Sequence, residues 1–259
     1  MSDTIEFTLI GNVAKIALNR PKVYNSFNRE MALELQARLK ECTDNLEIRA
    51  VYLTGNGKAF CAGQDLGEVV GENAPPLKKI LKEHLNPIVR LIRNMDKPVI
   101  CAVNGVAAGA GANMALACDI TFAAESVSFI QAFSKIGLIP DMSGTYSLPR
   151  LIGMQRATAL MMTGDKLSAN EAEKIGMIYK AVPNEELENV AFALAEKLSK
   201  MPTAALGMTK RALNASLSNS LEEQLVVEDK YQTAASETED YAEGVAAFLE
   251  KRKPIFKGK

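Results

Sequence analysis

Residues 97–119 read KPVICAVNGVAAGAGANMALACD and contain the features that decide the fold. The uncharged apolar run at 99–103 predicts a buried strand, and Asn104 with Gly105 predicts a turn after it. Small residues at 107–112 then lead into 113–118, whose composition is compatible with a helix. A helix that starts after such a turn exposes unpaired main-chain N–H groups. These groups favour an anion or a developing negative charge, so the stretch predicts a site for one.

Apolar segments around this unit predict strands that alternate with helices. We expect strands at residues 5–10, 13–18, 50–54 and 120–123, and one ending at Val182. We expect helices at 29–43 with Asn28 as cap, at 77–94 with a kink at Pro87, at 148–163, after the cap Ser168 with Glu171, and throughout the chain from Asn184 with a break at Met201-Pro202. This order predicts an α/β layered fold. Residues 67–76, rich in Gly, Glu and Pro, predict a surface loop.

Composition excludes several classes of partner. The formal net charge of -1 predicts no general affinity for nucleic acid or an anionic membrane. No apolar run approaches the roughly 20 residues that span a bilayer, and the start, MSDTIEFTLI, does not have the pattern of a signal peptide. The four cysteines, Cys42, Cys61, Cys101 and Cys118, form no CxxC pair, so we expect reduced, buried thiols in a cytoplasmic protein.

Histidine chemistry is also excluded. His84 is the only histidine and lies in a polar, helix-like stretch, where we expect a solvated side chain. A Ser-His-Asp triad or a His-ligated zinc site would have to be built on it alone, so we predict neither, and no metal.

The common nucleotide and nucleophile motifs do not fit. Gly109 and Gly111 resemble the start of a dinucleotide fingerprint, but Met114 stands where its third glycine belongs. Ser143 is not in a GxSxG elbow. What remains is a pair of small-residue loops, FCAGQDL at 60–66 and NGVAAGAG at 104–111, each leading into a helix. Two N–H donors that converge on one oxygen would form an oxyanion hole, although tight helix–strand packing would explain the same composition equally well.

Motifs along nearly the whole chain resemble the crotonase, or enoyl-CoA hydratase/isomerase, superfamily. They are NRPKVYNSFN (19–28), GKAFCAGQDL (57–66), the stretch 97–119, GLIPDMSGT (137–145) and EGVAAFLEKRKPIF (243–256). Within the superfamily, NGVAAGAG together with FSKIGLIPD (133–141) is most similar to the ring-1,2-epoxyphenylacetyl-CoA isomerases of bacterial phenylacetate degradation.

The resemblance implies a spiral core of ββα units over residues 1–195 and a C-terminal helical region, 196–259, that builds trimers or stacked trimers. It also implies an acyl-CoA substrate, with coenzyme A as part of the substrate and no separate cofactor. By motif position, the thioester oxygen would accept the main-chain N–H groups of Gln64 and Ala110. Many members have glycine at the second place, so Ala110 would narrow the pocket and leave the hole intact.

The resemblance assigns further residues to the substrate. Those near the adenine and ribose are Lys22, Val23, Asn25, Ala62, Asp65 and Leu66. Gly109, Asn113 and Phe133 would lie near the thioester, residues 67–95 would line the acyl pocket, and Phe256 and Lys259 would reach a neighbouring subunit's ligand.

The reaction depends on which carboxylates are present. Hydratase members carry two glutamates that activate water, and on this chain those places hold Asn113 and Phe133, neither of which can transfer a proton as a base. Asp141 resembles the acid/base of the epoxyphenylacetyl-CoA isomerases, although it could instead close an Asx turn after Pro140. Burial beside Phe133, Ile139 and Met142 is expected to raise its pKa.

The resulting hypothesis is an acyl-CoA isomerase. Its reaction would convert epoxyphenylacetyl-CoA to oxepin-CoA, 3-enoyl-CoA to 2-enoyl-CoA, or both. The alternatives are an enoyl-CoA hydratase and a non-catalytic protein that binds CoA esters or RNA. The net charge of -1 and the absence of a basic cluster with aromatic residues argue against RNA.

Overall fold

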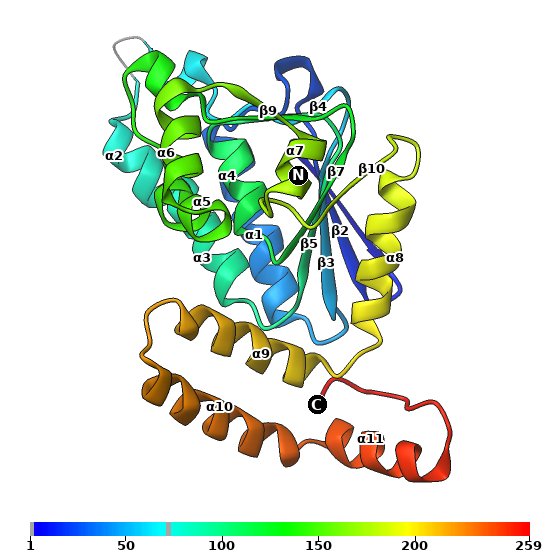
Figure 1. Ribbon diagram of the computed structural model, residues 1–259. Helices are drawn as coiled ribbons and strands as arrows, with labels where there is room; N and C mark the ends of the chain where they lie inside the picture. The colour runs from blue at the N-terminus through cyan, green and yellow to red at the C-terminus, as the bar shows by residue number, and fades with distance from the viewer. Residues whose placement is uncertain (1–2, 71–73) are drawn as a thin grey trace.

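The computed structural model describes residues 3–70 and 74–259 (Figure 1). The strands are β1 (Ile5–Ile10), β2 (Val13–Leu18), β3 (Ala50–Gly55), β4 (Ala59–Cys61), β5 (Val99–Val103), β6 (Val106–Ala108), β7 (Ile120–Ala124), β8 (Ser128–Ile130), β9 (Lys166–Ser168) and β10 (Lys180–Val182). The α-helices are α1 (Arg29–Asp44), α2 (Leu77–Lys79), α3 (Asn86–Asn94), α4 (Ala110–Ala117), α5 (Gly144–Ile152), α6 (Met154–Thr163), α7 (Ala169–Lys174), α8 (Leu187–Ser199), α9 (Thr203–Ser216), α10 (Leu221–Ser236) and α11 (Glu239–Glu250). Short 3-10 helices occur at η1 (Pro21–Val23), η2 (Leu66–Glu68) and η4 (Ala132–Ile136), and η3 (Ile80–Leu85) is a π-helix.

Two sheets organise the molecule. The larger has the order β1-β2-β3-β5-β7-β10, parallel except for the β1–β2 hairpin. The smaller has the order β4-β6-β8-β9. Each of the pairs β3–β4, β5–β6 and β7–β8 sends its first strand to the larger sheet and its second to the smaller one. This is the repeated strand–strand–helix spiral that the family resemblance implied, so the predicted α/β class is confirmed.

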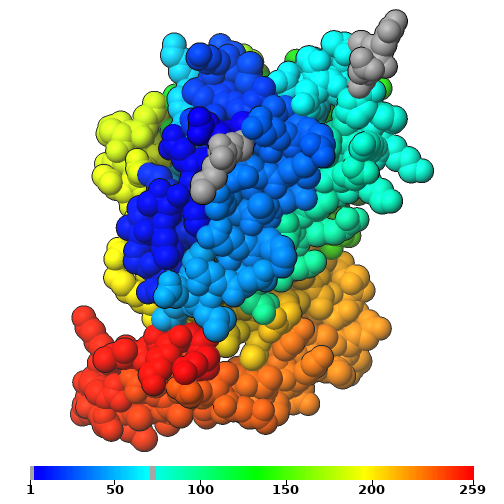
Figure 2. Space-filling model, turned by 180° about the vertical axis from the view of Figure 1, so that it is seen from behind, coloured from blue at the N-terminus to red at the C-terminus, as the bar shows by residue number. Residues whose placement is uncertain are grey.

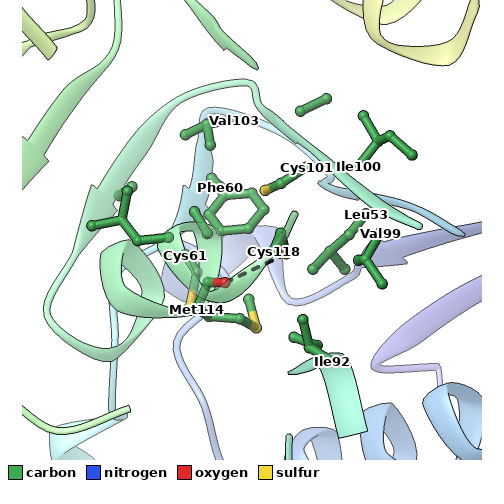
Figure 3. Close-up of a cluster of buried hydrophobic side chains, with 14 of the residues drawn as sticks. Leu53, Phe60, Cys61, Ile92, Val99, Ile100, Cys101, Val103, Met114 and Cys118 are labelled. Atoms are coloured by element: carbon green, nitrogen blue, oxygen red, sulfur yellow. Dashed lines mark hydrogen bonds between the residues drawn. The ribbon is translucent and has the colours of Figure 1, made fainter. Parts of the chain in front are cut away.

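The predicted strands all belong to the larger sheet. Its inner strands β2, β3 and β5 are largely apolar and buried on both faces, whereas β1 at its edge is mostly exposed and was predicted from alternation. In Figure 1, α8 covers one face of this sheet and α1, α3 and α4 lie on the other. Side chains of β3, β4, β5 and α4 meet between them, including Leu53, Phe60, Cys101 and Met114 (Figure 3). Cys61, Cys101 and Cys118 are buried free thiols there, as predicted, and Cys42 is another.

The helix starts agree with their predicted caps. Asn28 accepts the main-chain N–H of Met31 at 2.9 Å, and Ser168 forms a capping box with Glu171. One predicted helix is divided in the structure. The helix expected at 148–163 breaks at Gly153, whose φ of 79° ends α5 and allows α6 to begin in a new direction.

The helix expected at 77–94 is continuous but contains the π-helical turns of η3, and Pro87 comes directly after them as the second residue of α3. The predicted solvation of His84 is wrong, because its side chain is only 2% exposed. It shares the buried face of η3 with Ile80 and Leu85, while the charged Lys82 and Glu83 face outwards and give the stretch its polar appearance. Neither ring nitrogen has a hydrogen-bond partner among residues 3–70 and 74–259, and burial lowers the pKa of the ring.

The chain from α8 to the end of α11 at Glu250 is helical as predicted, with Met201-Pro202 between α8 and α9, but the prediction is wrong for residues 251–259, which form no helix. Figures 1 and 2 show α9, α10 and α11 as a ledge along one end of the core. Lys210 of α9 anchors the ledge by donating to the carbonyl of Ile92 and to Asp119, both at 2.7 Å. Of the predicted surface loop, residues 71–73 lie outside the described part. None of the helices described has the length and apolar character needed to cross a membrane.

Candidate active site

A cavity of about 320 Å³ lies where the spiral core meets η3 and the segment after β8. Its walls are mostly apolar, and it brings together segments that are far apart in the sequence. The lining residues are Ala62, Gly63, Gln64, Leu66, Val69, Pro75, Leu77, Ile80, Leu85, Gly109, Ala110, Ala132, Phe133, Ile136, Leu138 and Asp141. The three residues predicted to be catalytic, Gln64, Ala110 and Asp141, are all among them.

The first main-chain amide at the cavity is that of Gln64. The carbonyl of Gly63 and the amide of Asp65 both bond to Phe27, at 2.7 and 2.9 Å. In an extended segment, the groups of the intervening residue point the opposite way. The N–H of Gln64 therefore faces away from Phe27, and it donates no hydrogen bond within the described chain.

The second amide is that of Ala110, the first residue of α4, which has no partner within its helix. The loop of Gln64 approaches it closely: a Cβ on Gly63 would lie 3.3 Å from the Ala110 nitrogen and 3.0 Å from the carbonyl oxygen of Ala108. Gly63 also has a φ of 94°, so glycine is required there twice over. The two loops thus converge, and two N–H groups at the positive end of a helix can stabilise one oxyanion.

Among the residues that the structure describes, Asp141 is the one carboxylate that lines the cavity. Burial raises its pKa to about 6, with its own main-chain N–H as an opposing influence. Its Oδ1 is buried and finds no hydrogen-bond partner in the described residues. Of the residues expected to bury it, Phe133 lines the same cavity and Met142 is itself buried, whereas Ile139 is 81% exposed.

The two positions that carry glutamates in hydratases have different surroundings. Phe133 lines the cavity, and its ring would lie 3.6 Å from a Cβ on Gly109. The prediction that Asn113 contacts substrate is wrong, because its side chain is fully buried outside the cavity wall. Its Nδ2 donates to the main-chain carbonyl of Asp141 at 2.9 Å, and its Oδ1 accepts from Gln131 at 2.8 Å.

The structure brings only some of the residues predicted for the nucleotide end to the cavity. Ala62 and Leu66 line the cavity, while Lys22 and Val23 lie exposed on η1. Asn25 is fully buried, with its amide bonded to the main chain of Arg20, Asn56 and Ala59, so its side chain cannot contact a ligand.

Asp65 is likewise occupied, by Arg20 at 3.0 Å and by the amide of Gly67 at 3.0 Å. A contact through its side chain would first require these bonds to break. The side chains of Asn25 and Asp65 therefore stabilise the loops in which they lie, and the neighbouring residues of these loops remain free to contact a ligand.

Several lining residues were not singled out from sequence. Ile136 and Leu138 are 54% and 41% exposed around the cavity, and only their place in the motif after Phe133 could have indicated them. Leu77, Ile80 and Leu85 fall inside the range 67–95 expected to form the acyl wall. Outside the cavity, the tail residues Phe256 and Lys259 are bonded through their carbonyls to Arg49 and to the amide of Asp240. No cluster of three or more potential metal ligands occurs in the part of the chain that the structure covers.

Known proteins resemble this chain over almost its whole length. The family model for enoyl-CoA hydratase/isomerase matches residues 9–259. A 1,2-epoxyphenylacetyl-CoA isomerase from Escherichia coli is 48% identical over 250 residues, covering 95% of each chain. A protein from Rhodobacter capsulatus named as a probable enoyl-CoA hydratase is 44% identical over 256 residues, covering 99% of this chain and 98% of the relative.

Solved structures of similar proteins have the same fold as this chain. An enoyl-CoA hydratase from Bacillus anthracis superposes with a TM-score of 0.92 at 36% identity, covering 99% of this chain and 100% of the other. An enoyl-CoA hydratase from Mycobacterium smegmatis gives 0.92 at 27% identity, covering 98% and 99%.

Proposed function

The chain belongs to the enoyl-CoA hydratase/isomerase family, and from this premise we propose that it is a CoA-thioester isomerase whose single acid/base is Asp141. One observation carries the proposal: the cavity that receives the amides of Gln64 and Ala110 contains this carboxylate and, among residues 3–70 and 74–259, no other. A water-adding mechanism that uses two glutamates has no counterpart at Asn113 and Phe133.

The proposed chemistry divides between the amides and the carboxylate. The thioester oxygen accepts the N–H groups of Gln64 and Ala110, and these stabilise the negative charge that develops as a proton leaves carbon. Each donor contributes about 3 kcal/mol in the transition state. For 3-enoyl-CoA, Asp141 takes the proton from C2 and returns it to C4 as the double bond moves. For the epoxide, the carbon–carbon bond shared by the epoxide and the six-membered ring breaks to give the seven-membered oxepin ring, and Asp141 moves one proton from the carbon next to the thioester to a ring carbon. Substrate and product are isomers in both reactions, so atoms balance without an outside reactant. Such acid–base catalysis supplies roughly 10²–10⁴-fold. The proton carrier is Asp141 itself, so no metal or redox cofactor enters the scheme.

The apolar lining of the cavity supports the proposal that the acyl group of the substrate is apolar. Leu77, Ile80 and Leu85 form one wall and Ile136 with Leu138 another. The substrates we propose are epoxyphenylacetyl-CoA, 3-enoyl-CoA, or both, and the name of the Escherichia coli relative supports the first. The nucleotide end of coenzyme A would extend past Ala62 towards Lys22, since the amide of Ala62 is bonded at 3.0 Å to the carbonyl of Tyr24, the residue that follows η1 and its Lys22.

Enoyl-CoA hydratase is the second candidate, supported by the name of the Rhodobacter capsulatus relative. Crotonyl-CoA hydration separates the two functions. Turnover near the typical enzyme median of about 10 s⁻¹ would favour the hydratase.

Replacing Asp141 by Asn tests the acid/base role directly. A panel of CoA thioesters that includes epoxyphenylacetyl-CoA and 3-hexenoyl-CoA is incubated with enzyme in D₂O, and hydrogen exchange and products are read by mass spectrometry. We expect Asp141→Asn to lower isomerisation and exchange by roughly 10²–10⁴-fold, the share that acid–base catalysis supplies, while the ester still binds. Asp44→Asn, on an exposed carboxylate of α1, is the matched control. Unchanged turnover in Asp141→Asn would exclude the proposal.

A further inference from the structure

The turn that carries Asp141 has a strained main chain. Met142 and Ser143 both adopt the left-handed conformation, with φ values of 48° and 63°. Each such residue that is not glycine costs roughly 1–3 kcal/mol and persists only where its surroundings fix it. One restraint is local, since the amide of Gly144 donates to the Asp141 carbonyl at 2.8 Å.

The second restraint comes from Asn113. Its Nδ2 donates to the same carbonyl at 2.9 Å, and the Asn113 side chain is fully buried. The contact is so close that a Cβ on Gly144 would lie 2.3 Å from this Nδ2, so only glycine fits opposite it. Because Nδ2 must face the carbonyl, the Oδ1 of Asn113 is directed to Gln131, whose Nε2 donates to it at 2.8 Å.

Asn113 and the second oxyanion amide belong to the same helix. Ala110 is the first residue of α4, and Asn113 follows about one turn later. We propose, resting on the function proposed above, that Asn113 is a positioning residue, braced by Gln131, which fixes the Asp141 carboxylate relative to the oxyanion amides. One rigid helix then sets the place of both halves of the chemistry.

Anchoring through the main chain leaves the carboxylate free. A donor placed on the carboxylate itself would stabilise the ionised form and compete with the substrate's proton. Here the donor is on the carbonyl, and Oδ1 of Asp141 remains without a partner in the described chain. Such positioning matters because a displacement of about 1 Å can cost about 10²-fold in rate.

Asn113→Ala and Gln131→Met test the assignment, with 3-hexenoyl-CoA as the substrate probe and butyryl-CoA as the binding probe. We expect Asn113→Ala to lower kcat by about 10- to 100-fold with the Kd of butyryl-CoA unchanged, because Asn113 does not line the cavity. Gln131→Met leaves the hydrogen bond from Asn113 to the Asp141 carbonyl in place, and we expect it to lower kcat by about 3- to 10-fold.

The pH profile distinguishes positioning from a general loss of stability. Burial holds the pKa of Asp141 at about 6, so the acid limb of kcat/KM is expected near that pH in the parent enzyme. In Asn113→Ala the turn is released and water reaches Asp141. The pKa that sets the acid limb should therefore fall towards the ordinary aspartate range. Thr54→Val is the control: it removes another buried hydrogen bond of 2.8 Å, from Thr54 to the Ala102 carbonyl, and should leave kcat and the profile unchanged.

The outcomes separate this inference from the proposed function. If Asp141→Asn is inactive but both variants keep kcat within two-fold and the parent pH profile, Asn113 does not position Asp141. If Asp141→Asn keeps its turnover, the proposed function fails and the inference fails with it. Should Asn113→Ala not fold, Gln131→Met decides: a lower kcat with a shifted acid limb supports the assignment, and unchanged values overturn it.

Discussion

The carboxyl group of Asp141 lies where its ionised form is disfavoured. The folded chain holds its pKa at about 6 against an ordinary value of 3.8, chiefly because burial removes water from the anion. Stability from the protonated form is complete below pH 3.8 and is lost as the pH rises through 6. At neutral pH the enzyme therefore retains a destabilising charge, which is the state a proton acceptor requires.

Asp141→Asn should consequently stabilise the fold while it removes activity. We expect its free energy of unfolding to exceed the parent's by about 3 kcal/mol at pH 8 and by only about 1 kcal/mol at pH 4.5. Urea unfolding at the two pH values measures both differences. Asp44→Asn, at an exposed site, should show neither gain. An equal gain at both pH values would mean that burial of the charge is not its cause.

At the scale of the element, η3 carries both a titrating side chain, His84, and residues of the acyl wall. Ile80 and Leu85 line the cavity, and His84 is buried on the same face of the π-helix without a partner for either nitrogen within the described residues. Burial lowers the pKa of His84, with the nearby Arg29 acting in the same direction. The unfolded chain therefore binds this proton more readily, so the stability that the neutral ring allows above pH 6.5 is lost as the pH falls.

His84→Leu should flatten this dependence. At pH 5.5 the parent's loss from His84 is at most about 1.4 kcal/mol, and the variant should not have it. Urea unfolding at pH 7.5 and 5.5 gives the comparison, and His84 is the chain's only histidine, so no other imidazole contributes. Asp141 titrates in the same range with the opposite sign, so the difference between variant and parent is the quantity to use. A variant with the parent's pH dependence would contradict this account of His84.

The lengths and burial of the elements explain which parts of the fold can be predicted from the sequence. The run at 99–103 agrees with β5 because a strand buried in a sheet leaves an apolar run, and the segments at 5–10 and 13–18 agree with β1 and β2 because their residues alternate. The smaller sheet was missed, since β4, β6, β8 and β9 have three residues each and no measurable period. Gln64 and Ala110 could be predicted from motifs, but the roles of Asn113 and Asn25 could not. Both use their amides on main-chain groups distant in sequence, and residue type does not indicate such partners.

At the scale of the whole molecule, the ledge of α9–α11 is fixed to the core yet incompletely covered. Lys210 reaches Asp119 and the Ile92 carbonyl, which anchors α9. A groove of about 640 Å³ runs between α9 and α10, and apolar side chains around it are open. Leu213 and Leu225, which line this groove, are 61% and 48% exposed. Apolar side chains exposed along one groove mark an interaction surface, and we propose that copies of the chain cover it as a trimer or a pair of trimers.

Leu213→Asp should weaken this assembly, because a carboxylate in the groove would be buried without a partner at the joined surface. By light scattering after size exclusion at micromolar concentration, we expect the parent at three or six times 28.0 kDa and the variant shifted towards 28.0 kDa. Leu46→Asp, on a side chain that is 89% exposed outside the ledge, is the matched control and should keep the parent's mass. If the tail of a neighbour completes the nucleotide site through Phe256 or Lys259, dissociation will also raise the KM for CoA esters while kcat, which depends on Asp141 and α4 within one chain, changes less. A parent of 28.0 kDa, or a variant of unchanged mass, would show that this face is not the subunit interface.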